Sequence, residues 1–104
     1  MRRGEVWWAE LPSPVFPRPV VGLTQDSVVN SIGSVVVALV TRTRIGFPSE
    51  LAIGQREGLP RPSVASLDNI VTVPRSCFVR QLGALAQKRI EELNLAIRFA
   101  LDIP

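Results

Sequence analysis

The sequence contains no histidine and only one cysteine, Cys77. Without histidine it lacks the commonest zinc ligand and the usual general acid or base near neutral pH. A lone cysteine forms neither an internal disulfide nor a cysteine metal cluster. An enzyme of this composition works with Arg, Asp, Glu, Ser, Thr or backbone groups, and we expect it to use no metal ion and no cofactor.

Long apolar runs are also missing. The longest run, Val35–Val40, is much shorter than the roughly 20 residues of a transmembrane helix. The chain after Met1 has no stretch with the apolar region and cleavage site of a signal peptide. We therefore expect a cytoplasmic location and no membrane partner.

Lysine is rare among the basic residues, since 11 of the 12 are arginine and only Lys88 is lysine. A guanidinium group binds phosphate through two parallel hydrogen bonds and stacks on bases, so an arginine-rich surface suits nucleic acid. The net charge is only +3, and a GC-rich genome would also favour arginine codons. Composition alone leaves both explanations open.

The length of 104 residues, 46% of them hydrophobic, predicts one folded domain over residues 1–104. Short segments rich in β-branched and aromatic residues alternate with turn-forming residues, which predicts strands. The apolar run at 34–41 is typical of a strand buried on both faces. We expect loops at 12–17 and 54–62 and a turn of helix at Val28-Val29. The expected strands are 4–11, 19–24, 34–41, 50–53, 63–67, 70–73 and 78–82, with Asp68-Asn69 as the turn between 63–67 and 70–73.

The helical periodicity is confined to the end of the chain, where residues 86–101 predict one amphipathic helix without a good N-terminal cap. Its core stripe comprises Ala86, Ile90, Leu93, Ile97, Ala100 and Leu101. Leu95 and Phe99 project from the opposite side, either as scattered surface residues or as a contact with another subunit or partner. The strands and this helix together predict a mainly β (α+β) fold, a strongly curved antiparallel sheet or small barrel.

Polar residues cluster in sequence where the expected strands end. Arg18 is held extended between Pro17 and Pro19, either as a rim residue or as a phosphate ligand. Thr41 ends an apolar strand and is followed by Arg42 and Arg44, while Asp68 and Asn69 interrupt two strands. Strand ends often carry functional groups, yet each residue has a structural explanation as well. Thr41 is β-branched and therefore suits a strand, and Asp68-Asn69 suits a turn. The two arginines could simply lie on a solvent-exposed face of a strand.

Four motifs in a fixed order change this balance. They are Arg3-Gly4-Glu5-Val6-Trp7, Arg18-Pro19-Val20-Val21, Val37-Ala38-Leu39-Val40-Thr41 and the segment from Ser63 to Val73, S-V-A-S-L-D-N-I-V-T-V. In this order and spacing they closely resemble the MazF/PemK family, the ribonuclease toxins of toxin–antitoxin operons. The resemblance runs from Arg3 to the C-terminal helix.

The resemblance implies an SH3-like small β-barrel with a C-terminal helix, acting as a homodimer and inhibited by a cognate antitoxin. Such toxins cut single-stranded RNA, mainly mRNA, at short sequences without a metal ion and leave 2′,3′-cyclic phosphate and 5′-hydroxyl ends. By the family pattern Arg18 and Thr41 are catalytic, Arg18 binding the scissile phosphate and Thr41 hydrogen-bonding it. Asp68 matches a position that is acidic in several relatives and is a third catalytic candidate.

The sequence departs from the family in the loop before Arg18. Many relatives have a longer loop there with a glutamate, whereas Pro12–Pro17 is short and has no acidic residue, so the group that takes the 2′-OH proton remains open. Neighbouring residues on a strand face opposite ways, so one of Trp7 and Trp8 is expected in the core and the other exposed for base stacking. The candidate RNA contacts are Trp8, Gln25, Arg42, Arg44, Arg61, Ser63 and Asn69.

Two other functions fit the same resemblance. The fold is shared with CcdB-like toxins, which bind DNA gyrase through a terminal-helix surface and cut nothing, and the exposed Leu95 and Phe99 would suit that role. A member of the family that keeps antitoxin binding but has lost cleavage is the other alternative, since the loop acid is missing.

Overall fold

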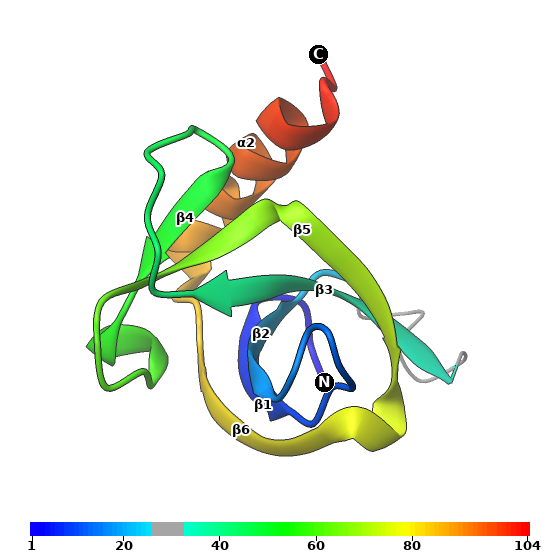
Figure 1. The fold of residues 1–104 in the computed structure, drawn as a ribbon. Coiled ribbons are helices and arrows are strands. Elements are labelled where there is room, and N and C mark those ends of the chain that lie inside the picture. Colours follow the sequence, from blue (N-terminus) through cyan, green and yellow to red (C-terminus); the bar gives the residue numbers. More distant parts are fainter. Residues whose placement is uncertain (26–32) are drawn as a thin grey trace.

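The computed structural model describes residues 1–25 and 33–104 (Figure 1). Val28-Val29, where a turn of helix is expected, lies outside the described residues. The strands are β1 (Glu5–Ala9), β2 (Arg18–Gly22), β3 (Ser34–Thr41), β4 (Glu50–Ile53), β5 (Ser63–Pro74) and β6 (Phe78–Ala84). The helix α2 spans Ile90–Leu101, and short 3-10 turns lie at Gln55–Glu57, Arg75–Cys77 and Gln87–Arg89. Among the described residues, no helix has the length and hydropathy needed to cross a bilayer.

All six strands belong to one antiparallel sheet with the order β4-β5-β3-β2-β1-β6. The sheet is strongly curved, with β5 and β6 bending around β1 and β2 (Figure 1). β4 and β6 are its edges and do not pair with each other in the described part of the chain, so the sheet is not closed. The prediction of a mainly β fold with a C-terminal helix is confirmed, in the form of an open, curved sheet.

β5 corrects the expected turn at Asp68-Asn69. Residues 63–74 form one continuous strand, and its pairing with β3 shifts from Ile70↔Ala38 to Ser66↔Leu39. The intervening residues of β5 therefore form a bulge, and one of them, Leu67, donates its N–H to the carbonyl of Ser49, 2.9 Å away. Asp and Asn disfavour strands locally, but pairing on both sides of them keeps the chain extended.

The core has two parts, and β3 contributes to both. Val35 and Val37 pack into a cluster with Ala9 and Val20. Ala38 and Val40 of the same strand belong to the larger cluster, which includes Leu67 and Leu93 and lies under α2. The expectation that both faces of this strand are buried is confirmed.

α2 begins at Ile90, later than expected, because the preceding residues form a 3-10 turn, and no side chain caps its N-terminus. Leu93 and Ala96 are buried, while Ile90, Ile97 and Ala100 pack against the larger core cluster. Two members of the predicted stripe are wrong, since Ala86 precedes the helix and Leu101, its last residue, is 55% exposed. Leu95 and Phe99 are exposed, as the periodicity predicts.

Candidate active site

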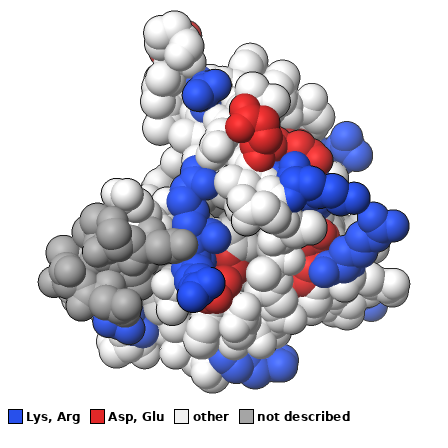
Figure 2. All heavy atoms as spheres, turned by 180° about the vertical axis from the view of Figure 1, so that it is seen from behind, with Lys and Arg blue, Asp and Glu red and all other residues white. Residues whose placement is uncertain are grey.

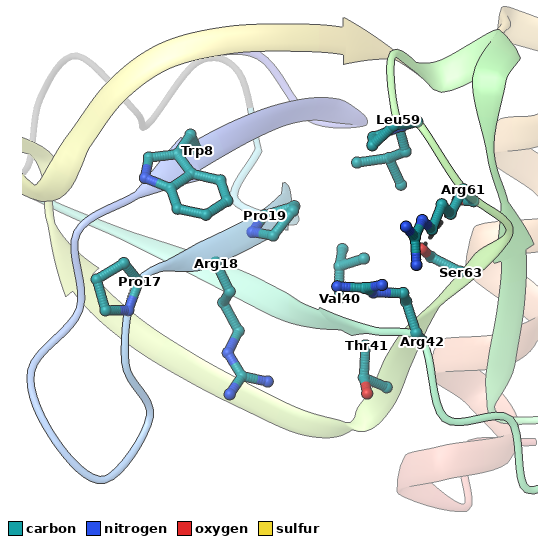
Figure 3. A pocket seen from close by; sticks show the side chains of 11 residues that line it. Trp8, Pro17, Arg18, Pro19, Val40, Thr41, Arg42, Leu59, Arg61 and Ser63 are labelled. Carbon is teal, nitrogen blue, oxygen red and sulfur yellow. Dashed lines mark hydrogen bonds between the residues drawn. The ribbon is translucent and has the colours of Figure 1, made fainter.

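β2, β3 and β5 each have one terminus at the same end of the sheet. β2 begins where β3 ends because the two strands are antiparallel, with Val20 opposite Leu39. The same register continued by two residues places Arg18 opposite Thr41. β5 begins beside this point, since Val64 pairs with Thr41. Residues on opposite positions of neighbouring strands share a face, and in Figure 3 the side chains of Arg18 and Thr41 extend to the same side of the strands.

A cavity of about 520 Å³ opens beside these three strand termini (Figure 3). It brings together six of the residues that the sequence singled out, namely Trp8, Arg18, Thr41, Arg42, Arg61 and Ser63. The other lining residues are apolar and were not predicted: Pro17, Pro19, Val40, Leu59 and Pro60. The cavity therefore combines three guanidinium groups with a largely apolar wall.

The loop before β2 fixes the guanidinium of Arg18. Its Nε and Nη2 donate to the carbonyl oxygen of Val15 at 3.0 and 2.6 Å. That carbonyl is oriented by a tight turn in which the N–H groups of Val15 and Phe16 both donate to the carbonyl of Pro12. Phe16 has a φ of 64°, a conformation that is uncommon outside glycine and is found at sites the surrounding structure holds in place. No other acceptor within residues 1–25 and 33–104 is bonded to Arg18, so its remaining donors are available for an anion.

Thr41 is half-buried at the end of β3. Its Oγ1 accepts a hydrogen bond from the N–H of Thr43 at 3.2 Å. A threonine hydroxyl also carries one hydrogen that it can donate. The backbone contact therefore orients Oγ1 and leaves its hydrogen for a ligand beside Arg18.

The two tryptophans of β1 face different surroundings, as expected for neighbours on a strand. Trp7 packs against the second core cluster, with its ring centroid 6.1 Å from that of Phe78. Trp8 lines the cavity, and its indole N–H donates to Oε1 of Glu10 at 3.1 Å. Trp8 therefore presents a fixed aromatic face to a ligand in the cavity.

Asp68 and Asn69 lie away from this cavity in the single chain. Both are exposed in the β5 bulge and line another hollow, together with Ile45, Phe47 and Phe99. The Asp68 carboxylate accepts a hydrogen bond from the Ser49 hydroxyl, and Asn69 Nδ2 donates to Ser66 Oγ at 2.9 Å. The structure thus does not bring Asp68 together with Arg18 and Thr41 within one chain.

Two further candidates lie outside the cavity. Gln25 is exposed at the end of the first described segment and does not line the cavity. Arg44 lines a smaller adjoining hollow, which shares Arg42 and Ser63 with the cavity.

Charge is distributed unevenly around the molecule. The lining of the cavity has three arginines and no carboxylate among the described residues. The face turned away in Figure 1 instead shows basic side chains interleaved with acidic ones (Figure 2). Within residues 1–25 and 33–104 no group of three or more Cys, Asp or Glu side chains is placed to hold a metal ion. The cavity is therefore suited to an anionic ligand.

The backbone and apolar parts of the site are not predicted by the sequence. The Val15 carbonyl that orients Arg18 has no side-chain signature, although the prolines around it predict a rigid loop. Leu59 and Pro60 come from a loop that only the tertiary structure brings over β2 and β3. Their proximity could not be inferred from spacing alone.

Comparisons with known proteins agree with this fold. Residues 2–101 match the family model described as PemK-like, MazF-like toxin of type II toxin–antitoxin system. The chain is 43% identical over 99 residues to a probable endoribonuclease MazF2 of Mycobacterium tuberculosis, covering 94% of this chain and 95% of that protein. The toxin MazF-mt6 of the same organism has a solved structure with a TM-score of 0.89 and 34% identity, covering 96% and 98% of the two chains. A mycobacterial endoribonuclease solved with its cognate antitoxin gives a TM-score of 0.87 at 25% identity, covering 100% and 97%.

Proposed function

The chain belongs to the family of PemK-like, MazF-like toxins of type II toxin–antitoxin systems, and we propose that it cuts single-stranded RNA as an endoribonuclease whose activity a cognate antitoxin blocks. Relatives that match nearly its whole length are named endoribonucleases. A similar solved structure is an endoribonuclease bound to its antitoxin. The observation that carries the proposal is the placement of Arg18 and Thr41 together in one arginine-lined cavity.

In the proposed reaction the RNA supplies its own nucleophile. The 2′-oxygen forms a bond to the adjacent phosphorus while the bond from phosphorus to the 5′-oxygen breaks. The 2′-OH loses its proton and the leaving 5′-oxygen gains one. The products are a 2′,3′-cyclic phosphate and a 5′-hydroxyl. No protein nucleophile and no metal ion are needed for this exchange.

Arg18 and Thr41 act on the phosphate during this step. The donors of Arg18 not bonded to Val15 bind the non-bridging oxygens, on which negative charge grows in the transition state. The Thr41 hydroxyl donates to the same phosphate. The pKa of arginine is too high for it to exchange protons efficiently near neutral pH, and the described cavity lining has no carboxylate. In this proposal the two residues stabilise charge and do not take the 2′-OH proton.

The remaining lining residues bind the nucleotides around the scissile phosphate. The Trp8 ring offers a stacking face for an unstacked base. Arg42 and Arg61 extend toward the space between β2 and the loop at 59–63 (Figure 3), where they meet flanking phosphates or base edges. Ser63 adds a hydroxyl at the same opening.

The test is digestion of a long RNA by the purified protein in EDTA, with the cut positions and end groups mapped. We expect cyclic phosphate and 5′-hydroxyl ends. Arg18→Ala should slow cleavage by about 100-fold or more, as does removal of a donor that binds transition-state charge elsewhere. Arg75→Ala is the control, because Arg75 lies beyond the end of β5 that pairs with the start of β3. Absence of cleavage by the parent, or equal rates for the parent and Arg18→Ala, would contradict the proposal.

The proposed protein partners are a second copy of the chain and the antitoxin. Ile45, Phe47 and Phe99 are 68%, 55% and 57% exposed and line one hollow. Apolar side chains gathered in this way are typical of an interaction surface. We assign this surface to the homodimer, with Leu95 beside it on α2. The gyrase-binding alternative also uses a helix surface, but it gives no reason for Arg18 and Thr41 to share a cavity.

A further inference from the structure

The candidate active-site cavity is the first of three adjoining hollows. It shares Arg42 and Ser63 with a hollow of about 150 Å³ that is also lined by Arg44. That hollow in turn shares Ala52, Ile53 and Pro62 with a third one of about 530 Å³. We call the second and third hollows the β4 track. It leads from the end of β3, along the edge strand β4, to the 3-10 turn at Gln55–Glu57.

The β4 track exposes positive charge. Arg42, Arg56 and Arg61 form no salt bridge with any carboxylate of the described residues. Arg44 helps to lower the pKa of Glu50, but that carboxylate is chiefly bound by the N–H groups of Gly46 and Ile45. Guanidinium groups without carboxylate partners at successive positions suit a chain of phosphates.

The carboxylate that lines the track does not cancel this charge. Glu57 is 4% exposed, and its Oε2 lies 3.3 Å from Nη1 of Arg89. Its other oxygen accepts the N–H of Gly54 at 2.7 Å. Glu57 is therefore occupied inside the protein, and the solvent-facing side of the track is left to Arg44 and Arg56.

A free sheet edge is also a possible site for a peptide strand, but β4 is poorly suited to one. An added strand bonds to the outward carbonyl and N–H groups of the edge. Here Nη2 of Arg89 already donates to the Ala52 carbonyl at 2.7 Å. The next residues along the chain turn away into a 3-10 helix, which ends the edge. The track therefore favours phosphates over a protein strand.

We propose that the single-stranded RNA on one side of the cut leaves the cavity along the β4 track, where Arg44 and Arg56 bind its phosphates. This rests on the proposed function, because the cavity supplies the start of the strand. The track adds affinity for longer RNA without contributing to the chemical step. Phosphate contacts of this kind position the strand and carry no direct sequence information.

Binding is tested with random-sequence 2′-O-methyl RNA, which has no free 2′-OH and cannot be cut by the proposed reaction. Fluorescence anisotropy compares strands of about 6 and about 20 nucleotides, lengths that bracket common single-strand site sizes. For Arg44→Gln/Arg56→Gln we expect about tenfold weaker binding of the long strand. The slope of the logarithm of its binding constant against the logarithm of the salt concentration should be smaller in magnitude by about 1.4, since each phosphate contact contributes about 0.7. Binding of the short strand should be nearly unchanged.

Arg2→Gln/Arg75→Gln is the matched control, because it removes the same charge at the other end of the sheet. Arg2 lies beside Gly22, the end of β2 opposite to Arg18, and Arg75 follows β5 at the end that pairs with the start of β3. The proposal would be overturned if the variant lost the same affinity for both strand lengths, or if the control variant lost as much affinity for the long strand. Unchanged RNA binding by Arg44→Gln/Arg56→Gln would also overturn it, even if that variant bound the antitoxin more weakly. Cleavage of ordinary RNA is measured separately, so a parent that binds by length but never cuts overturns the proposed function and leaves the track standing.

Discussion

Arg89 connects the start of α2 to the edge of the sheet, and Arg89→Met would remove that connection. Nη1 lies 3.3 Å from Glu57, and Nη2 donates to the Ala52 carbonyl at 2.7 Å and to Glu92 at 3.0 Å. The hydrogen bond with Glu92 is the largest cause that raises the pKa of Arg89, and Glu57 adds to it. Methionine keeps an unbranched aliphatic side chain at this position but has no donor for any of these groups.

The expected loss of stability follows from what remains around Glu57. Its side chain is 5% exposed, and without Arg89 its carboxylate keeps a single partner in the described part of the chain, the N–H of Gly54. Removing one partner of a buried ion pair costs about 3–5 kcal/mol. The Arg89 side chain is 19% exposed, so water reaches part of the pair, and we expect the lower end of that range, about 3 kcal/mol. At about 4–8 °C per kcal/mol for a domain of this size, Tm should fall by about 12–24 °C.

Two less disruptive variants separate the buried pair of Arg89 with Glu57 from its exposed pair with Glu92. Glu92→Gln breaks a pair whose acid is 54% exposed and should cost about 0–1 kcal/mol. Glu57→Gln keeps the shape of the side chain and an acceptor for Gly54, and Arg89 keeps Ala52 and Glu92, so its cost should be about 1 kcal/mol. The measurement is urea unfolding followed by tryptophan fluorescence, supported by thermal melts. If Arg89→Met loses no more stability than Glu92→Gln, the buried carboxylate does not depend on Arg89 and the reasoning is refuted.

Two further predictions concern the loop after β3 and the exposed face of α2. Hydrogen bonds from Gly46 and Ile45 lower the pKa of Glu50 below its ordinary value of 4.5, so their stabilising effect is present above that value and is lost as pH falls through the lower folded-state pKa. The protection factors of these two N–H groups, with the intrinsic pH dependence of amide exchange divided out, should therefore fall as Glu50 becomes protonated at its lowered pKa, and protection factors that stay constant until Glu50 is fully protonated would contradict this. Phe99→Asp places a charge on the proposed dimer surface and should shift the protein toward monomer in sedimentation velocity while its far-UV circular dichroism stays the same. A parent that sediments as a monomer at all concentrations would remove the basis of that surface assignment.

The predictable part of the fold is the part in which local pattern and burial agree. β3 and β4 have the predicted limits, because β3 is one continuous apolar run and turn-forming residues bound both strands. The turn at Asp68-Asn69 was wrong, since local preference competes there with pairing to two neighbours. Glu50 pairs with Ser66 before the bulge, and Ala38 pairs with Ile70 after it. Such long-range pairing leaves no mark in the local sequence.

The candidate site divides in the same way. Arg18 and Thr41 could be placed together from the sequence because Arg18 begins one strand, Thr41 ends another, and each lies in a motif that the family resemblance marks as catalytic. The position of Leu59 and Arg61 depends instead on close contact between two backbone segments, one at Glu57-Gly58 and the other at Leu82-Gly83. A Cβ on Gly83 would overlap the carbonyl of Glu57, and one on Gly58, whose φ is 89°, would overlap that of Leu82.

This contact presses the 3-10 turn at Gln55–Glu57 against β6, and Leu59, 3% exposed, anchors the following residues in the larger core cluster. The loop that carries Arg61 to the cavity is thereby held at both ends, by the turn and by β5. The same turn contains Glu57, which Arg89 pairs with from the start of α2. The wall of the cavity opposite Arg18 therefore rests on contacts outside the cavity. Variants of Arg89 should accordingly weaken binding of the short 2′-O-methyl RNA, which does not reach the β4 track, as well as lower stability. Unchanged affinity for the short strand in fluorescence anisotropy would show that the cavity residues hold this wall by themselves.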